Sequence, residues 1–372
     1  MVLNCRRERS HSLELVDETA YGLKLTAPAQ SVVKWPSMPK CDVLMVRHFY
    51  DRFIAEHVQC VLPDEEGADP QPQTQLVITG TPGIGKSAFG MYLLHRALNA
   101  GKTVVFVRNE QAVGVPHVTV FHDGAVWGAL SIDHVNGLVL DRNVVYLYDG
   151  ERPATLGYNT ILITSPDKSL WTKFEKTGAR LRYFPVFSLH ELLQLQQLQP
   201  SISPEEVCER YDLAGGSARL VMNKLSEKEN FAALDERACG ITPSVLMKLH
   251  ASPRVLAKEE MVHHLIHYKV DREIFFITGV AFASEQVRRM CEEHAKTGGK
   301  AELAAFMTAA EKYSVFASAT GQMFEAQCPG RIAQGVACTL RPLSGAGTDK
   351  EEKFRAPSNV RINKFGHVDS IK

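Results

Sequence analysis

The feature that most constrains the fold of this chain is the octapeptide GTPGIGKS at residues 80–87. It fits the phosphate-loop pattern G-x-x-x-x-G-K-[ST] at every fixed position. Residues 75–79, immediately before it, form a short apolar and β-branched run that is typical of a buried strand. Residues 88–99, after it, place apolar side chains at helical spacing, and Gly101 follows as a stop signal. The stretch therefore predicts a strand, a glycine loop and a helix, in that order.

The glycine loop is expected to bind phosphate, the alternative being a plain Gly-rich turn. Glycines let the backbone curl so that successive N–H groups point inward, and the helix start adds about half a positive charge there. Lys86 is expected to reach the β- and γ-phosphates of a nucleotide, and the Ser87 hydroxyl to bind Mg²⁺. The nucleotide-binding residues predicted in this stretch are Gly80, Thr81, Pro82, Gly83, Ile84, Gly85, Lys86, Ser87 and Ala88.

Composition limits the class of protein without selecting a partner. The 372 residues suffice for two or three domains, and 42 basic residues balance 42 acidic ones. This neutral charge does not favour a nucleic-acid or membrane partner. The eight cysteines include no C-x-x-C pair, which suits a reducing compartment. No apolar run approaches about 18 residues, and the first residues lack the apolar segment of a signal peptide, so an intracellular protein is expected.

Residues 144–149 form a continuous apolar run that ends in Asp149 and predicts a central parallel strand. A carboxylate at the end of such a strand is expected to hold Mg²⁺ directly or through water, as a Walker B acid. The other interpretation is that Asp149 and Gly150 simply form a turn. Glu151 is a candidate for polarising the attacking water, or else a solvated loop residue.

Residues 160–164 predict a further strand, which ends in hydroxyl side chains. Since ligands of such sheets lie beyond the carboxyl ends of the strands, Thr164 or Ser165 is expected to sense the γ-phosphate. A turn made by strand-end hydroxyls is the equal alternative. Other expected strands lie at residues 103–107, 183–186 and 273–278, with a hairpin at 117–127 whose turn is Asp123-Gly124.

From residue 188 the pattern becomes helical. Leucines at helical spacing fill residues 190–198, and Ser203 opens a capping box with Glu206. Gly215-Gly216 then breaks the chain before another helix that begins near Arg219. We expect a helical lid in which Arg219 touches the nucleotide phosphates, an ordinary surface arginine being the alternative. Further helices are expected around residues 44–54, 284–293, 301–311 and 321–325.

These elements predict an α/β P-loop fold with a mostly parallel sheet flanked by helices. Four parts are expected: an N-terminal segment and linker at 1–70, a nucleotide-binding core at 71–187, a helical lid at 188–255, and a smaller C-terminal α/β region at 256–372.

The ordered set of motifs resembles the NTPase region shared by Crinkler effectors of oomycetes and chytrids and by retrotransposon-hot-spot proteins of trypanosomatids. The matching pieces are residues 46–50, 80–87 with 92–95, 148–150, 160–166 with Trp171 and Phe174, and Gly215-Gly216 with Arg219. The resemblance covers roughly residues 40–370. It implies an AAA/STAND-like ATPase, strengthens the sensor role of Arg219, and implies an effector that is secreted and acts in a host cell or nucleus.

Many members of that family continue into a restriction-endonuclease-like domain, and residues 321–325 look like its first helix. The amino-terminal Crinkler targeting region is not evident, and the carboxylate-plus-lysine strands of the nuclease would lie beyond Lys372. We therefore expect an incomplete nuclease-like region in which Glu325 is structural and DNA is not cut.

The expected function is ATP binding and hydrolysis with Mg²⁺ in an effector or regulator that has a protein partner. No guanine-reading N-K-x-D motif is present. Alternatives are a nucleotide-gated binding module without turnover and a nucleic-acid-processing NTPase-nuclease. The expected catalytic residues are Lys86, Asp149, Glu151 and Arg219, and the expected metal ligands are Ser87 and Asp149.

Overall fold

The computed structural model describes residues 14–15, 22–26, 43–63, 72–109, 116–130, 132–222, 227–239, 262–297, 338–340 and 350–352. Contacts divide the chain into two compact units, Met1–Ile241 with Ala251–Cys291, and Thr242–His250 with Glu292–Lys372. Within the second unit, β13 (Cys338–Leu340) and β14 (Lys350–Glu352) pair antiparallel. The helices predicted at 301–311 and 321–325, and Glu325 with them, lie outside the described residues.

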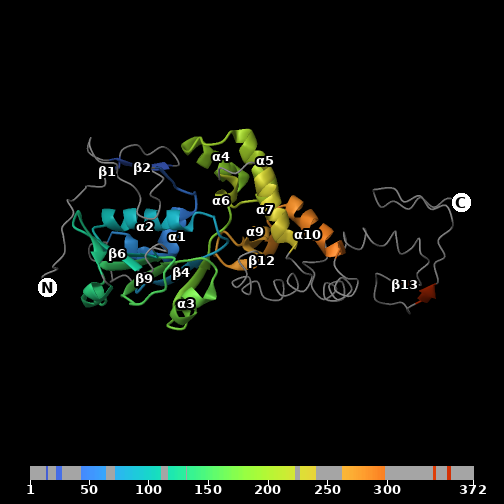
Figure 1. Cartoon of the computed structure of the whole chain (residues 1–372). Coiled ribbons are helices and arrows are strands. Elements are labelled where there is room, and N and C mark those ends of the chain that lie inside the picture. Colours follow the sequence, from blue (N-terminus) through green and yellow to red (C-terminus); the bar gives the residue numbers. More distant parts are fainter. Residues whose placement is uncertain are drawn as a thin grey trace. The chain divides into compact units, whose positions relative to one another are not determined.

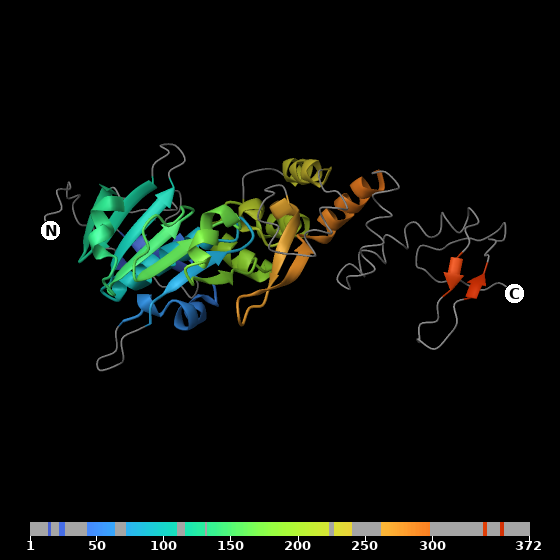
Figure 2. The same cartoon turned by 90° about the horizontal axis from the view of Figure 1, so that it is seen from below.

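A seven-stranded sheet forms the centre of the first unit, with the strand order β10-β4-β9-β8-β5-β6-β7 (Figure 1). The strands β10, β4, β9, β8 and β5 run parallel, and β6 and β7 continue the sheet antiparallel. Figure 2 shows the strands side by side. Their bounds are β4 (Gln75–Thr79), β5 (Thr103–Asn109), β6 (Pro116–His122), β7 (Ala125–Leu130), β8 (Val144–Asp149), β9 (Asn159–Ile163) and β10 (Arg180–Tyr183).

Helices cover both faces of this sheet, so the predicted α/β fold with a mostly parallel sheet is confirmed. Helices α1 (Tyr50–His57) and α2 (Lys86–Asn99) lie on one face and α3 (Lys168–Glu175) on the other (Figure 1). Alternation along the strands places Leu76 and Ile78 in the core cluster shared with α1 and α2. The aromatic rings of Phe53, Phe89 and Phe184 meet edge to face or tilted in that cluster.

The predicted hairpin at residues 117–127 is confirmed as β6 and β7. Asp123 and Gly124 both have positive φ values, 46° and 67°, as a two-residue turn of the favoured hand requires. Phe121 lies opposite Val126, and His122 opposite Ala125. The hairpin therefore extends the edge of the parallel sheet.

Helices follow the sheet, as predicted from residue 188. Ser188 and Ser203 each form a capping box, with Glu191 and Glu206, so two helix starts are fixed by local sequence. A two-stranded antiparallel hairpin, β11–β12, comes later. The bounds are α4 (Leu189–Leu198), α5 (Pro204–Ala214), α6 (Ala218–Val221), α7 (Glu227–Cys239), α9 (Val262–Leu265), β11 (Ile266–Val270), β12 (Ile277–Phe282) and α10 (Glu285–Thr297). None of the described helices is both long and apolar enough to cross a membrane.

Smaller elements complete the described chain. The strands β1 (Glu14–Leu15), β2 (Gly22–Thr26) and β3 (Val43–Met45) form an antiparallel sheet. Two 3₁₀ helices, η1 (Gln59–Val61) and η2 (Ile132–Leu138), lie between larger elements. The expected helix over residues 44–54 was wrong at its start, because residues 43–45 pair with β2 and the helix begins at Tyr50.

Two other strand predictions need correction. The strand expected at 183–186 ends at Tyr183, because Pro185 has no N–H to donate and Arg47 binds the carbonyls of Pro185 and Val186. The strand expected at 273–278 is mostly a turn, since Phe275 has φ +56° and places a fully buried ring in the core. Burying such a ring yields about 1.5–3 kcal/mol, comparable with the strain of that backbone.

Candidate functional site

The predicted strand, glycine loop and helix are present as β4, residues 80–85 and α2. Gly80, Gly83 and Gly85 have φ values of +142°, +78° and +81°, which side chains rarely adopt. At Gly83 space is also limiting, because a Cβ there would lie 2.6 Å from Ser217 Oγ. The glycine spacing of the motif is therefore needed both for the curl of the loop and for its contact with α6.

Every carbonyl of the loop accepts a hydrogen bond from the protein. Lys86 Nζ donates to the carbonyls of residues 80 and 81, at 2.8 and 2.9 Å. Ser217 Oγ donates to that of residue 82 at 3.3 Å, and the Arg219 N–H to that of residue 83 at 3.1 Å. Arg47 Nη1 approaches the carbonyl of residue 84 at 3.5 Å, and the Phe89 N–H donates to that of residue 85 at 3.0 Å.

The backbone N–H groups of residues 83–87, by contrast, donate no hydrogen bond within the described part of the chain. Gly85 caps α2 without a side-chain hydrogen bond. Free N–H groups at a helix start, together with the helix dipole, form an anion-binding site. The loop thus offers donors toward a ligand while its acceptors are already satisfied.

Lys86 lies at the first position of α2 and is 9% exposed. Burial, and then the charge of Arg219, lower the pKa of its ammonium group to about 7, while Asp149 raises it. An anion bound at the loop would favour the charged form and oppose this shift. Lys86 therefore suits a phosphate ligand better than it suits the loop carbonyls alone.

Ser87 and Asp149 meet although they come from different elements. Ser87 Oγ donates a hydrogen bond of 2.9 Å to Asp149 Oδ1. Ser87 lies in the first turn of α2 and Asp149 ends β8, and both are half-buried. A hydroxyl and a carboxylate oxygen at this spacing are the hard ligands that Mg²⁺ prefers. The two predicted metal ligands are thus side by side.

Thr164 follows β9, the strand between β4 and β8, and is 2% exposed. Its Oγ1 has no hydrogen-bond partner among the described residues, and neither has Oγ1 of Thr79 at the end of β4. Both hydroxyls therefore lie at the carboxyl ends of adjacent strands, the edge of such sheets where ligands bind. Ser165, the alternative sensor, is exposed.

Arg219 is near the loop, whereas Glu151 makes no hydrogen bond to it. The Arg219 N–H binds the loop, its Cβ would be 2.7 Å from a Cβ at Gly83, and its charge acts on Lys86. The carboxylate of Glu151 acts electrostatically on Tyr148, whose hydroxyl donates to Thr155 O at 2.7 Å. Of the four predicted catalytic residues, three therefore gather at the loop.

The sequence did not predict the buried ion pair of Arg47 and Glu191, whose arginine also bonds to the loop at the Ile84 carbonyl. Arg47 Nε and Nη2 donate to Glu191 at 2.9 and 3.1 Å, with 0% and 3% of the two side chains exposed. The guanidinium also stacks on Phe187, with Cζ 4.0 Å from the ring centroid. The capping-box spacing of Ser188 and Glu191 was the available signal, but nothing local pairs Glu191 with Arg47, 144 residues away.

No protein-family model matches the chain. It is similar to two curated proteins of Phytophthora infestans. Crinkler effector protein 16 is 26% identical over 301 residues, which cover 77% of this chain and 46% of that protein. Crinkler effector protein 15 is 24% identical over 277 residues, covering 72% and 44%. The chain thus spans less than half the length of these relatives.

Among solved structures, the chain is similar to the Thermotoga maritima RuvB Holliday junction branch migration motor. That likeness has a TM-score of 0.32 and 12% identity, and it covers 71% of this chain and 81% of that one. A likeness at this level says nothing further about function. The two sequence matches to Crinkler effector proteins support the Crinkler part of the resemblance, as a distant similarity.

Proposed function

We propose that this chain binds ATP with Mg²⁺ at the loop of residues 80–87 and hydrolyses it, as part of an effector or regulator. The effector role is proposed from the similarity to the Crinkler effector proteins, as is an AAA/STAND-like organisation from the resemblance of the motifs. Action inside a host cell, and an unidentified protein partner, belong to the same proposal.

The observation that supports nucleotide binding most strongly is that the carbonyls of the loop are hydrogen-bonded within the described part of the chain while its N–H groups are not. The six carbonyls of residues 80–85 accept hydrogen bonds within the protein, while the N–H groups at the start of α2 donate none to the described residues. The first N–H groups of any helix lack intrahelical partners, and at this helix start they stand beside the buried ammonium group of Lys86. Phosphate oxygens, which accept several hydrogen bonds and carry negative charge, satisfy both features.

Ser87 and Asp149 would hold the Mg²⁺ ion, which supplies charge neutralisation at the transferring phosphoryl group. Lys86 would exchange the carbonyls of residues 80 and 81 for phosphate oxygens. Arg219 would stabilise charge that develops on those oxygens, and Thr164 would donate its unpartnered hydroxyl. We propose these roles for the site residues that the sequence predicts.

A second candidate is a nucleotide-gated binding module that holds ATP without useful turnover. Glu151, the predicted residue for polarising water, makes its electrostatic contact with Tyr148, and no hydrogen bond joins it to the loop, Ser87 or Asp149. A protein that binds the ground state without orienting water would turn over slowly. Steady-state phosphate release separates the two candidates.

The test is thermal unfolding of the full chain with and without Mg-ATP. Ligand at one hundred times its dissociation constant adds about 2.7 kcal/mol, which raises the melting temperature by about 5–10 °C. We expect Lys86→Ala to lose most of this rise. Lys173→Ala, on the opposite face in α3 and exposed, serves as the matched control and should keep it. An equal rise in the Lys86→Ala variant would refute the assignment.

A further inference from the structure

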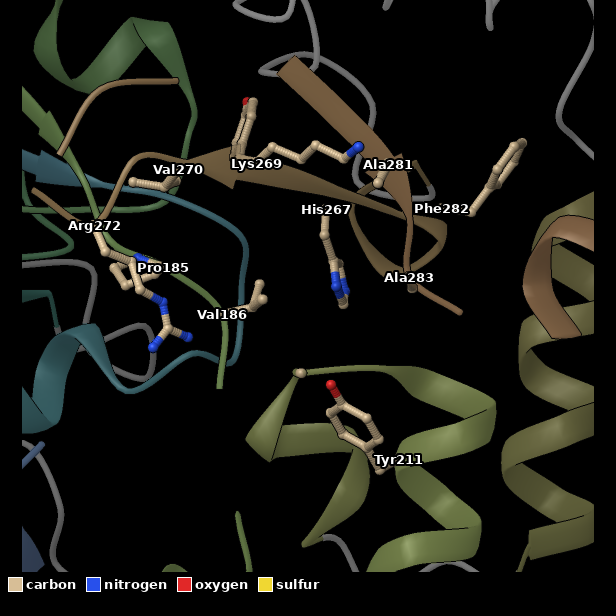
Figure 3. Close-up of a pocket in the computed structure, with 12 residues that line it drawn as sticks. Pro185, Val186, Tyr211, His267, Lys269, Val270, Arg272, Ala281, Phe282 and Ala283 are labelled. Atoms are coloured by element: carbon tan, nitrogen blue, oxygen red, sulfur yellow. The ribbon is translucent and has the colours of Figure 1, made fainter. Parts of the chain in front are cut away.

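A small cavity lies in the first unit, beside the loop and separate from the N–H groups described above. Three segments line it: the residues after β10, the end of α5 with Gly216, and the hairpin β11–β12 (Figure 3). Its volume is about 290 Å³, at the small end of the range for ligand pockets. Pro185, Val186, Ala281 and Phe282 give it apolar walls beside the polar side chains of Tyr211, His267, Lys269 and Arg272. Such a space suits one flat ring system rather than a whole nucleotide.

His267 is a buried polar side chain of this cavity. It is 5% exposed, and its Nε2 has no hydrogen-bond partner among the described residues. Figure 3 shows its imidazole extending from β11 toward the side of the cavity where Tyr211 of α5 lies. Buried ring nitrogens are normally paired, so the orphan nitrogen marks a place for a ligand atom.

His267 is neutral in this environment. Burial, followed by the charge of His264, lowers the pKa of its imidazole to about 4. The cations that line the cavity, Lys269 and Arg272, are exposed. An uncharged imidazole between apolar walls favours an uncharged partner that can hydrogen-bond, and disfavours a phosphate or carboxylate.

Gly215 brings the end of α5 against the hairpin and so closes one side of the cavity. It has φ +64°, and a Cβ at this position would lie 2.0 Å from Ala283 O and 3.1 Å from His267 Cε1. No other residue type fits that approach without moving the hairpin. The distance between α5 and His267 is thus set by the backbone, as a preformed pocket requires.

Lining residues of the cavity, or their neighbours in the chain, are hydrogen-bonded to the phosphate loop. The Tyr268 N–H donates to Thr81 Oγ1 at 3.3 Å. Gly216 immediately precedes Ser217, which binds Pro82 O at 3.3 Å. On the third side, Arg47 joins Val186 O, at 3.0 Å, to Ile84 O, at 3.5 Å. Each lining segment is therefore bonded, directly or through the next residue, to a loop residue, which places the cavity beside the loop.

We propose that this cavity receives the heterocyclic base of the nucleotide whose phosphates the loop binds, and that His267 determines base affinity through its Nε2. The proposal rests on the proposed function of the loop. An aromatic base is flat and uncharged, and it carries ring and exocyclic groups that pair with a neutral imidazole. The apolar walls would hold its faces.

The experiment measures binding to the full chain by titration calorimetry with Mg²⁺. The ligands are ATP and ribose 5-triphosphate, which keeps the sugar and phosphates and lacks the base. We expect the wild type to bind ATP at least about tenfold more tightly. His267→Leu should weaken ATP about tenfold while ribose 5-triphosphate stays within about twofold, and His267→Gln, which keeps a hydrogen-bonding group, should restore part of the loss.

His57→Leu is the matched control, because His57 is also buried, has an orphan Nδ1 and lies on α1 outside the cavity. It should leave both affinities unchanged. Equal binding of the two ligands by the wild type, or an equal loss of both in His267→Leu, would overturn the base site while leaving the phosphate loop intact. If Lys86→Ala binds both ligands as the wild type does, the loop assignment itself fails, and the base site with it.

Discussion

Replacing Arg47 by Met should be among the most destabilising single changes in the described chain. The variant leaves the Glu191 carboxylate, 3% exposed, without its bidentate partner. It also leaves the carbonyls of Pro185 and Val186, which accept from Arg47 at 2.9 and 3.0 Å, without that donor. Removing one member of a buried ion pair costs about 3–5 kcal/mol, or roughly 6–20 °C in melting temperature.

The control is Arg52→Met, one turn into α1. Arg52 pairs with Glu273 at 2.7 Å, but these side chains are 38% and 77% exposed, so the expected loss is only about 0–1 kcal/mol. The double variant Arg47→Met/Glu191→Leu should recover part of the loss, since no unpaired charge stays buried. Urea unfolding of all four proteins at pH 7 measures the differences. Equal losses in Arg47→Met and Arg52→Met would refute this reasoning.

The same pair predicts a dependence on pH. Burial alone would raise the pKa of Glu191, but the hydrogen bonds and charge of Arg47, together with the Ser188 N–H and the charge of Arg272, outweigh it and hold this pKa below its usual value. The contribution of Glu191 is therefore present at neutral pH and is lost as the pH falls through its folded-state pKa. Without Arg47, only the Ser188 N–H and Arg272 oppose burial, so that pKa rises relative to the wild type, and protonation of Glu191 in mild acid relieves the variant. The stability difference should shrink between pH 7 and pH 5; a constant difference would contradict the assignment of the loss to Glu191.

Three further predictions concern single residues at the site and its support. Asp149→Asn should lower phosphate release by at least about tenfold while changing ATP affinity much less, because the carboxylate acts on the metal in the transition state; an unchanged turnover number would exclude it as the metal ligand. Thr164→Val should leave unfolding without ligand unchanged or slightly stabilised, since it removes an orphan buried hydroxyl, and should reduce phosphate release; loss of ligand-free stability above about 1 kcal/mol would show that the hydroxyl is already paired. Gly215→Ala should destabilise by clearly more than Gly124→Ala in thermal unfolding, because Gly215, at φ +64° and ψ −150°, has a backbone almost exclusive to glycine and would also place a Cβ in contact, whereas a Cβ at Gly124, at φ +67°, meets nothing within 4 Å; similar losses would mean that neither the contact nor the backbone of Gly215 matters.

Local signals in the sequence sufficed for the parts of the site that come from one segment. The β-branched run, the glycines and the helical spacing around residue 80 predict β4, the loop and α2. The continuous apolar run before Asp149 predicts β8, and its parallel pairing places Asp149 beside Ser87. The Asp123-Gly124 turn predicts the β6–β7 hairpin. Each of these depends on interactions within a few residues or on one rule of sheet order.

The remainder depends on contacts between distant segments, which one sequence does not reveal. Arg47 lies before a helix, where an arginine is usually solvated. It is nevertheless only 1% exposed and pairs with Glu191. Phe275 looks like a strand residue because it is aromatic, but its ring leaves the hairpin to pack on Phe53, with centroids 4.8 Å apart. His267 lies in a short apolar strand, and only the approach of Gly215 makes it a cavity residue. In each case the burial of the side chain in the folded protein decides its role, and the local sequence pattern does not.

The loop at residues 80–85 depends on residues far along the chain for its shape. Its contacts with Ser217, Arg219 and Tyr268 join it to α6 and β11, the last across 187 residues of sequence. A nucleotide that pulls Lys86 off the carbonyls of residues 80 and 81 changes the electrostatic environment of the Arg219 side chain, because the two cations interact. The electrostatic free energies of the loop and of the α6 segment are therefore coupled through these two charges. Ligand binding at the loop must alter the free energy of both, in proportion to the difference in their contacts with and without the ligand.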